Sequence, residues 1–372
     1  MKILFVTKPV NPELDEGSKK NSWQIASFCK NHQFYLMTYH NNKPLLTSHK
    51  ARLIFKKVYN DKNFNYLQKL RLVVFLLFCN DGVSVYHYFF VPTLISSKVL
   101  WLITKLKKKK SIQSIPSLYK TDLSYNSLKK LCFADKIVVY SNHTEKALNN
   151  NGIYNVIKIN AGVNLENYGK APKISSDRNI YNFSFGRTIV LFSGELSRLN
   201  SVKLLFSIIQ KVVSARSDID FVMASPIRSS KDIRSLKIIE NEISTNRLRN
   251  RVHLFKTVKN FSHLLSICDI FLYPVSSMVG KIDTPLTVLE AMASELPIII
   301  SDIEPLNEIL KLRAGFAVAP EDTNSFANAI LELADDATLR GQMGQEARRI
   351  IQKHYDLDSM IRGYEKLYDE LA

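Results

Sequence analysis

Short apolar runs alternate with stretches of helical periodicity along most of the chain. Apolar runs typical of strands in the first half cover 2–7, 33–38, 83–88, 111–115, 136–140 and 156–159. The intervening stretches 22–31, 64–78, 93–106, 123–133 and 144–150 have the pattern of helices. Strands that alternate with helices are typical of a parallel sheet covered by helices on both faces. The first half therefore predicts one doubly wound sheet.

The same alternation begins again after a polar, glycine-punctuated segment at 170–187 that reads as a linker. Strands are then predicted at 188–193, 220–224, 252–255, 270–273, 297–301 and 315–318. Helices are predicted at 202–214, 231–241, 261–267, 285–293 and 323–334. The fold class is therefore α/β, with two Rossmann-like, doubly wound parallel sheets in succession.

The length of 372 residues agrees with two domains of ordinary size. We place an N-terminal domain at 1–168 and a C-terminal domain at 188–352, with a last helix at about 356–372 that packs back on the first domain. We find no short-period repeat, which excludes solenoid and propeller folds.

The chain is strongly basic, with 51 Lys and Arg against 34 Asp and Glu and a formal charge of +17. Such a charge favours polyanions, anionic membrane surfaces or phosphorylated small molecules as partners. The four cysteines are widely spaced without a CxxC pair, which indicates neither a zinc site nor a disulfide framework and fits a reducing cytoplasm. We expect no signal peptide, because the N-terminus lacks a long apolar region followed by a small-residue cleavage site. We also expect no transmembrane helix, because the longest apolar run, 72–79, is too short to span a bilayer.

The segment KIDTPLTVLEAMASELPIIISD at 281–302 contains the most informative acids of the chain. Pro285 suits the first turn of a helix, and Asp283 or Thr284 can cap it. The helix start would face the crevice beyond the carboxyl end of the strand at 270–273, where its N–H groups suit a diphosphate. Glu290, among apolar neighbours, needs a partner, and a ribose diol would provide one. The alternative is that Asp283 only caps and Glu290 pairs with a Lys or Arg.

Three further places hold candidate site residues. Gly194 follows an apolar strand, where a backbone without Cβ can approach a phosphate, and the cations Arg198 and Lys203 stand nearby; the alternative is two solvated cations at a helix start. Gly17 suits a tight loop before a helix, and Lys19 or Lys20 can meet a phosphate; the alternative is a surface turn. His87 ends a strand at a sheet edge where ligands gather, but a structural histidine is the more common finding.

Motifs over nearly the whole chain resemble those of retaining GT-B glycosyltransferases, in particular glycosyltransferase family 4 of the "glycosyl transferases group 1" type. Besides 281–302, they are NPELDEGSKKNSWQIASF, FADKIVVYSNHTEKAL, INAGVNLENY, VLFSGELSRLNSVKLL, RVHLFKTVKNFSHLLSICDIFLYP and AGFAVAPEDTNSFANAILELADDATLRGQMGQEARRI. The resemblance implies two domains that face each other across a cleft, with a nucleotide-sugar donor held mainly by the second and an acceptor mainly by the first. It also implies transfer with retention of anomeric configuration and no requirement for a metal or other cofactor.

The resemblance assigns roles to individual residues. Glu290 matches the family glutamate on the donor ribose, and Gly194, Thr284, Pro285 and Leu286 are expected at the donor. Arg198 and Lys203 would stabilise the charge that grows on the departing diphosphate, which can itself take the acceptor proton. Asp283 would stand in for a glutamate that the family has at the place of Ile282.

Three positions depart from the family pattern. The usual Arg and Lys after the glycine are Glu195 and Asn200 here, and Pro116 replaces the histidine of a T-x-H pattern, so that His87 is left as a contributor to the sugar site. The altered positions raise the alternative of a catalytically impaired nucleotide-binding or scaffold protein with the same fold.

Two segments of the predicted first domain join apolar and basic residues. Segment 64–78 is apolar and aromatic with Lys69 and Arg71, and the basic run 105–110 follows another apolar helix. Together they would suit anionic lipid headgroups, unless they are two core helices and a solvated charge run.

We therefore expect a cytoplasmic glycosyltransferase that acts on a glycan or lipid-linked acceptor. If the two segments bind lipid, the protein is peripheral on the inner face of the membrane. Nucleic-acid binding would explain the charge, but no motif for it is present, and we expect no nucleic-acid partner.

Overall fold

The computed structural model describes residues 1–10, 17–39, 52–61, 63–79, 82–118, 124–169, 178, 180–184, 186–194, 199–225, 227, 230–258, 260–310 and 313–372. The chain divides into two compact units. Unit 1 comprises Met1–Gly162, Val279–Thr284 and Leu357–Ala372, and unit 2 comprises Val163–Met278 and Pro285–Asp356. Beside the predicted 1–168 and 188–352, unit 1 first ends at Gly162, unit 2 begins directly at Val163, and Val279–Thr284 leaves unit 2 to join unit 1. The backbone N–H of Asp283 donates to the carbonyl of Pro116 at 2.9 Å, which fixes that segment to unit 1.

Unit 1 contains a parallel sheet of seven strands in the order β3-β2-β1-β4-β5-β6-β7. The strands are β1 (Lys2–Val10), β2 (Gln33–Thr38), β3 (Arg52–Lys57), β4 (Val85–Phe89), β5 (Lys110–Ile115), β6 (Lys136–Val139) and β7 (Val156–Lys158). The helices of this unit are α1 (Gly17–Phe28), α2 (Tyr66–Phe78), α3 (Leu94–Leu106), α4 (Tyr125–Leu131), α5 (Asn142–Asn150) and α13 (Leu357–Asp369). The strand order reverses between β1 and β4, as in the Rossmann fold.

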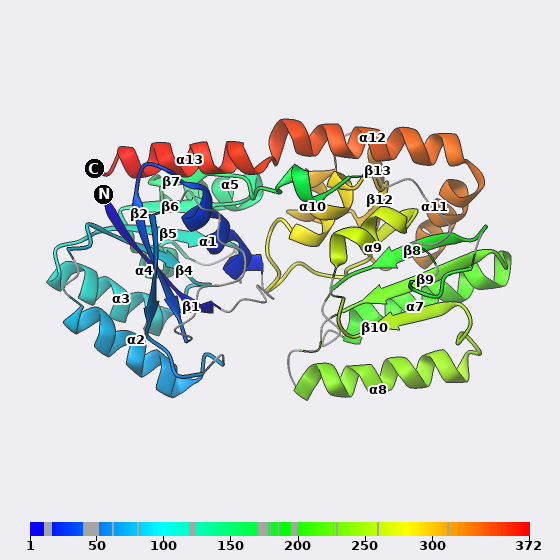
Figure 1. The fold of residues 1–372 in the computed structure, drawn as a ribbon, viewed down its shortest axis with the longest axis horizontal. Helices are drawn as coiled ribbons and strands as arrows, with labels where there is room; N and C mark the ends of the chain where they lie inside the picture. The colour runs from blue at the N-terminus through cyan, green and yellow to red at the C-terminus, as the bar shows by residue number, and fades with distance from the viewer. Residues whose placement is uncertain are drawn as a thin grey trace. The chain divides into compact units, whose positions relative to one another are not determined.

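Alternate residues of β1 enter two different cores, one on each face of this sheet. Ile3 and Phe5 pack with side chains of α1 and α13, whereas Leu4 and Val6 pack with side chains of α2 and α3. Successive side chains of a strand point to opposite faces, and both faces here are covered by helices (Figure 1). This is the doubly wound arrangement that the sequence predicts.

Unit 2 contains a parallel sheet of six strands in the order β10-β9-β8-β11-β12-β13. The strands are β8 (Thr188–Phe192), β9 (Ile219–Ala224), β10 (Val252–Phe255), β11 (Ile270–Tyr273), β12 (Ile298–Ser301) and β13 (Gly315–Val318). The helices are α7 (Leu199–Ala215), α8 (Ser230–Thr245), α9 (Phe261–Ile267), α10 (Leu286–Ala293), α11 (Thr323–Asp335) and α12 (Ala337–His354), with short 3-10 helices η1 (Leu165–Asn167) and η2 (Leu306–Ile309). The order reverses between β8 and β11, so that both units have the Rossmann topology.

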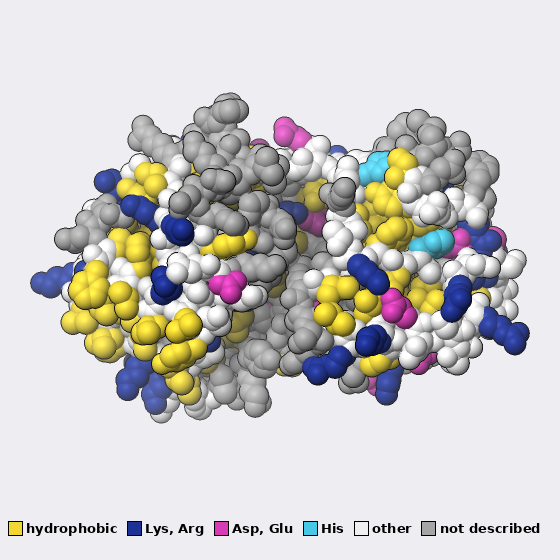
Figure 2. All heavy atoms as spheres, turned by 60° about the horizontal axis from the view of Figure 1, so that its bottom comes forward, with side chains coloured by type: hydrophobic (Ala, Val, Ile, Leu, Met, Phe, Trp, Pro, Cys, Tyr) yellow, Lys and Arg dark blue, Asp and Glu magenta, His cyan; other side chains and the backbone are white. Residues whose placement is uncertain are grey.

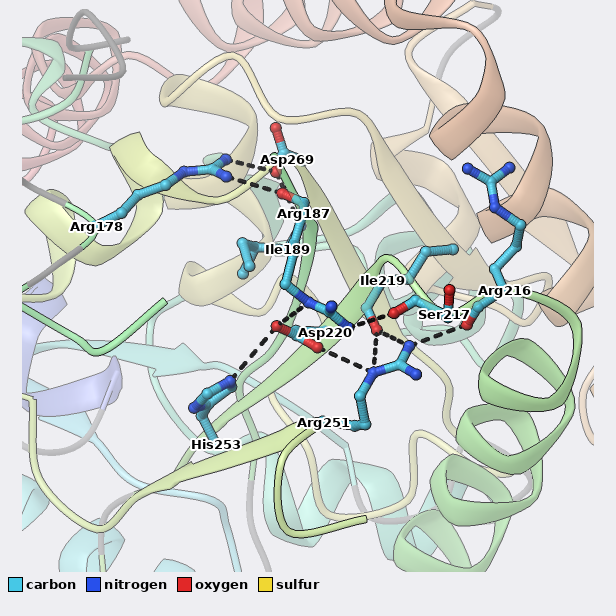
Figure 3. Close-up of polar contacts among 10 residues, drawn as sticks. All are labelled: Arg178, Arg187, Ile189, Arg216, Ser217, Ile219, Asp220, Arg251, His253 and Asp269. Atoms are coloured by element: carbon cyan, nitrogen blue, oxygen red, sulfur yellow. Dashed lines mark hydrogen bonds and ion pairs between the residues drawn. The ribbon is translucent and has the colours of Figure 1, made fainter. Parts of the chain in front are cut away.

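Charged side chains join the amino ends of the strands in unit 2 (Figure 3). Asp220, which is 2% exposed, accepts from Arg187 Nε at 2.6 Å and from Arg251 Nε at 3.1 Å. Arg178 Nη2 donates to Asp269 Oδ2 at 2.9 Å. Burial disfavours the Asp220 carboxylate, but the nearby His253 side chain and the hydrogen bonds of Arg187 and Arg251 outweigh it and lower the pKa of Asp220. This ionic network stabilises the edge of the sheet opposite to its carboxyl ends.

Among the described residues, no helix is both long and apolar enough to cross a bilayer.

Candidate functional site

The carboxyl ends of β8 and β11 lie side by side where the strand order of unit 2 reverses. Val190 to Phe192 of β8 pair with Ile270 to Leu272 of β11. Gly194 follows β8, and the chain that leaves β11 leads to helix α10. Open parallel sheets bind ligands at such a switch point, in the crevice beyond the carboxyl ends of the strands. The sequence-predicted residues Gly194 and Leu286 are therefore connected to the two strands that flank this point.

Helix α10 begins at Leu286 and has Pro285 at its N-cap. The prediction that Asp283 or Thr284 caps this helix is wrong, because Pro285 occupies the cap position without a side-chain cap bond. Both side chains are directed to other partners in unit 1. The hydroxyl of Thr284 donates to the carbonyl of Tyr140 at 3.1 Å. The first N–H groups of α10 are thus not used by either of the two predicted caps.

Glu290 lies one turn into α10 and is 5% exposed. Its helix is buried on nearly all sides, with Val288, Leu289, Ala291 and Met292 in the core. Leu286 and Glu290 are four residues apart, which places them on the same face of the helix near its start. A carboxylate in such a setting is costly unless hydrogen-bond donors surround it. A ligand with adjacent hydroxyl groups supplies such donors.

Gly194 is half-buried, and the lack of a side chain there has a specific steric reason. A Cβ atom at this position would lie 3.0 Å from Cζ of Phe192, a buried residue of β8. A side chain at this position would therefore require the ring of Phe192 to shift. Glu195 and Arg198 lie outside the described residues, as does the side chain of Asn200. Lys203 is exposed on the early part of α7.

Asp283 is 5% exposed and belongs to unit 1. Its Oδ2 accepts from the hydroxyls of Ser141 and Thr144, each at 2.6 Å. Ser141 is the N-cap of α5, and Thr144 lies in the first turn of that helix. Charge-assisted O–H···O bonds of this length are strong. The carboxylate therefore fastens the segment before α10 to the start of α5.

His87 is fully buried in β4 rather than open at a sheet edge. Its Nδ1 bonds with the hydroxyl of Tyr368 and its Nε2 with that of Ser114, both at 2.8 Å. Burial lowers the pKa of His87 well below its usual value, which keeps the imidazole neutral. Both ring nitrogens have protein partners, so the arrangement matches the structural alternative and offers no nitrogen to a sugar. The interaction joins α13 to the sheet of unit 1.

Gly17, Lys19 and Lys20 form the first turn of α1. Lys19 is only 6% exposed and Lys20 is half-buried, which differs from an ordinary surface turn. Residues 11–16, which complete the predicted loop, lie outside the described residues. The turn follows β1, and β1 pairs with β4 where the strand order of unit 1 reverses. Its position thus corresponds to that of Gly194 in unit 2.

The sequence interpretation missed a set of buried polar side chains near this turn. Thr7 Oγ1, Trp23 Nε1 and Gln24 Oε1 are buried and have no hydrogen-bond partner among the described residues. Buried polar groups are normally bonded, so these three atoms are exceptions within the described part of unit 1. A signal was available, because the stretch NSWQIAS mixes polar residues into a helix that is buried almost all round.

Comparison with known proteins gives related sequences for part of the chain. The family model described as glycosyl transferases group 1 matches residues 173–350. Alpha-D-kanosaminyltransferase of Streptomyces kanamyceticus is 23% identical over 189 residues, which are 50% of this chain and 46% of that protein. UDP-Gal:alpha-D-GlcNAc-diphosphoundecaprenol alpha-1,3-galactosyltransferase of Escherichia coli is 29% identical over 126 residues, 34% of this chain and 31% of that protein. The chain thus matches less than half the length of each relative.

A solved structure matches the whole chain. HepE of Anabaena, crystallised with UDP and glucose, superimposes with a TM-score of 0.80 at 16% identity and covers 99% of both chains. This similarity confirms the predicted GT-B class of two Rossmann-like domains. Residues 173–350, just under half of the chain, match the family of glycosyl transferases group 1.

Proposed function

We propose that this protein is a glycosyltransferase that moves a sugar from a nucleotide-diphosphate sugar to a glycan or lipid-linked acceptor. The observation that carries the proposal is the arrangement at the switch point of unit 2. Gly194 follows one of the two central strands, and the other leads to α10 with the buried Glu290 in its second turn. A diphosphate against the helix start would leave the ribose within reach of Glu290.

The comparisons support the substrate classes. The Anabaena structure contains UDP and glucose, and the name of the Escherichia coli relative describes transfer from UDP-Gal to a sugar on diphosphoundecaprenol. A nucleotide sugar as donor and a lipid-linked sugar as acceptor agree with a basic chain, since both carry diphosphate groups.

We assign the chemistry to the leaving group. As the glycosidic C–O bond breaks, negative charge grows on the diphosphate, and the α10 N–H groups together with Arg198 and Lys203 would stabilise it. The departing phosphate oxygen would take the acceptor proton, so that transfer proceeds with retention and without a bound metal. Asp283 would act by holding the segment before α10 in place, because Ser141 and Thr144 bond its carboxylate.

The binding test is Glu290→Gln, with UDP affinity measured by calorimetry. A hydrogen bond to a charged group contributes about 1.5–3 kcal/mol, so UDP should bind roughly 10- to 100-fold more weakly. Glu332→Gln is the matched control, because Glu332 is an exposed acid on α11 of the same unit. Both variants should keep the parent's circular dichroism spectrum. Unchanged UDP affinity in Glu290→Gln would remove the ribose assignment.

The activity test is a panel of nucleotide sugars with lipid extract as the acceptor source, with products found by mass spectrometry and their anomeric configuration determined by NMR. A new glycolipid whose anomeric configuration equals that of the donor is the expected result, and EDTA should not diminish it. Tight UDP binding without turnover of any donor would instead identify the scaffold protein that Glu195 and Asn200 raise as the alternative.

A further inference from the structure

Helices α2 and α3 of unit 1 pack against each other and expose apolar side chains on their outer faces. On α2, Tyr66, Leu70, Val74 and Phe78 recur every four residues and are 47–79% exposed. On α3, the exposed apolar residues are Leu94, Ile95, Trp101, Leu102 and Leu106, of which Ile95 is 80% exposed. Figure 2 shows hydrophobic side chains gathered at the end of the molecule that carries these helices. We call these nine residues the outer face.

The inner sides of the same helices are ordinary core. Leu72 and Leu76 of α2 and Leu100 and Ile103 of α3 are buried against the sheet. The alternative that these are core helices is thus correct for one side only. A helix that packs on a sheet normally carries polar residues on its other side. Here the outward side is also apolar, and burial within unit 1 does not explain it.

The charged side chains on α2 and α3 themselves are all basic. Neither Tyr66–Phe78 nor Leu94–Leu106 contains an acidic residue. Lys69 and Arg71 of α2 and Lys98 and Lys105 of α3 are all exposed. In the basic run 105–110 at the end of α3, Lys109 Nζ donates to the carbonyl of Val83. This lysine therefore contributes to the fold of unit 1. The cations on α2 and α3 are therefore the ones placed among the apolar side chains.

A groove runs beside α2. It has a volume of about 620 Å³, and its wall includes Leu67, Leu70, Val74 and Phe75 of this helix together with Val58. Arg71 also lines it. An apolar groove with a cation at its side is suited to an acyl chain whose headgroup is anionic.

Charge decides between the possible occupants. In a symmetric dimer the outer face would meet itself, which would bring cations against cations without an acid on either helix. A nucleic acid would pair with the cations but leave the aliphatic side chains Leu70, Val74 and Ile95 without a partner. An anionic bilayer satisfies both, since its headgroups attract Lys and Arg while its acyl region accepts apolar side chains.

We propose that the outer face of α2 and α3 docks this protein on the surface of an anionic phospholipid bilayer. The apolar side chains enter the boundary between headgroups and acyl chains, and the four exposed cations bind lipid phosphates. This surface goes beyond the sugar transfer proposed above, and its test uses no sugar nucleotide, so that either proposal can fail without the other.

The experiment is flotation of the full chain with phosphatidylcholine vesicles that contain or lack phosphatidylglycerol. We expect the parent to float with the anionic vesicles and to dissociate as salt is raised. The pair Lys98→Glu and Lys105→Glu should lower partitioning at least about tenfold, because each cation near such a surface contributes severalfold to binding. The triple variant Leu70→Ser, Val74→Ser and Ile95→Ser should lower partitioning to both kinds of vesicle.

Helix α8 of unit 2 offers matched controls, since Ile233, Lys237 and Ile238 are exposed on it. Ile233→Ser with Ile238→Ser, and Lys237→Glu alone, should float as the parent does. Circular dichroism and thermal unfolding verify that every variant is folded. Flotation of both outer-face variants at the parent's level would overturn the proposal. So would a parent that ignores vesicles and forms a dimer that the triple variant disrupts in sedimentation experiments.

Discussion

Asp220 is a nearly buried carboxylate whose charge is balanced by side chains from neighbouring strands. Arg187 precedes β8 and Arg251 precedes β10, and both bond the Asp220 side chain at the start of β9 between them (Figure 3). Desolvation of a charge costs free energy, which these ion pairs offset only while all partners are present. Removing one partner therefore lowers the stability of the fold by more than the intact network adds to it.

Asp220→Asn should lower the free energy of unfolding by about 3–5 kcal/mol, because it leaves two partly buried guanidinium groups without their shared anion. Urea unfolding followed by circular dichroism measures the change. Asp218→Asn is the control. Asp218 also pairs with an arginine, Arg216, at 2.7 Å, but its side chain is 45% exposed, and its loss should be much smaller. Equal effects of the two substitutions would contradict the role given to burial.

The same substitution has a pH signature. The pKa of Asp220 is lowered in the folded protein, so its contribution to stability is present above its unfolded value of about 4 and is lost as the pH falls below it. The difference in unfolding free energy between the parent and Asp220→Asn should hence shrink below about pH 4. A difference that does not change with acid would exclude the ionised carboxylate as the source of stability.

Single residues also show where sequence reasoning stops. The sequence indicates Asp283 and His87 as candidate site residues, but it does not show which side chains they bond. Asp283 bonds Ser141 and Thr144, and His87 bonds Ser114 and Tyr368. Ser141, Thr144 and Tyr368 lie more than a hundred residues from the side chains that they bond, and Ser114 lies on the next strand after His87. No local pattern connects such positions, so the choice between a site residue and a structural residue needed the fold.

At the scale of elements, α12 is attached closely to the end of α10 through a glycine. A Cβ atom on Gly344 would lie 2.1 Å from the carbonyl oxygen of Glu295, just beyond α10. Such a distance cannot be relieved by a rotamer change, because the obstacle is backbone. The position of α12 against α10, the helix of the candidate donor site, thus depends on a missing side chain.

Gly344→Ala should destabilise unit 2 by about 1–3 kcal/mol, the usual cost of overpacking a close contact. It should also weaken UDP binding if α10 moves. Gly341→Ala in the same helix has no atom within 4 Å of the added Cβ and should stabilise the helix by about 0.5–1 kcal/mol. Thermal unfolding of both variants checks the opposite signs. If Gly344→Ala stabilised the protein, the close contact between Gly344 and the Glu295 carbonyl would not be needed for the packing of α12 on α10.

Elements with a strong pattern were predicted well. The strands at 33–38, 252–255, 270–273 and 315–318 agree with the structure at both ends, as does the helix at 261–267. Strand β3 was missed because it is a short edge strand with exposed positions and cations at both ends, RLIFKK, a pattern also typical of loops. The apolar pattern does not predict helix α12 as an element of its own, because its polar composition gives a weak apolar stripe.

For the whole molecule, the prediction of two doubly wound sheets is confirmed, while the division of the chain between them was only partly predictable. The alternation of strands and helices is a local pattern, and it predicts the type and order of the elements. The last helix, expected at about 356–372 on the first domain, lies in unit 1 as Leu357–Ala372, but the alternation does not report that Val279–Thr284 also returns to unit 1. Those returns depend on individual contacts, such as the N–H of Asp283 on Pro116 and the hydroxyl of Tyr368 on His87.

Because each unit has its own core, hydrogen exchange can show which unit binds the donor nucleotide. A ligand that binds only the folded state stabilises it by about 2.7 kcal/mol at a hundredfold excess over its Kd, which slows exchange of the linked amides roughly 100-fold. UDP should therefore protect β8, β11 and α10 of unit 2 in hydrogen exchange measured by mass spectrometry. Strands β3 and β7, at the two edges of the sheet in unit 1, should exchange as they do without the nucleotide. In Glu290→Gln the same UDP concentration should give less protection, since fewer molecules are bound. Protection that appeared in unit 1 while β8, β11 and α10 stayed unchanged would place the nucleotide on the other sheet and refute the donor site.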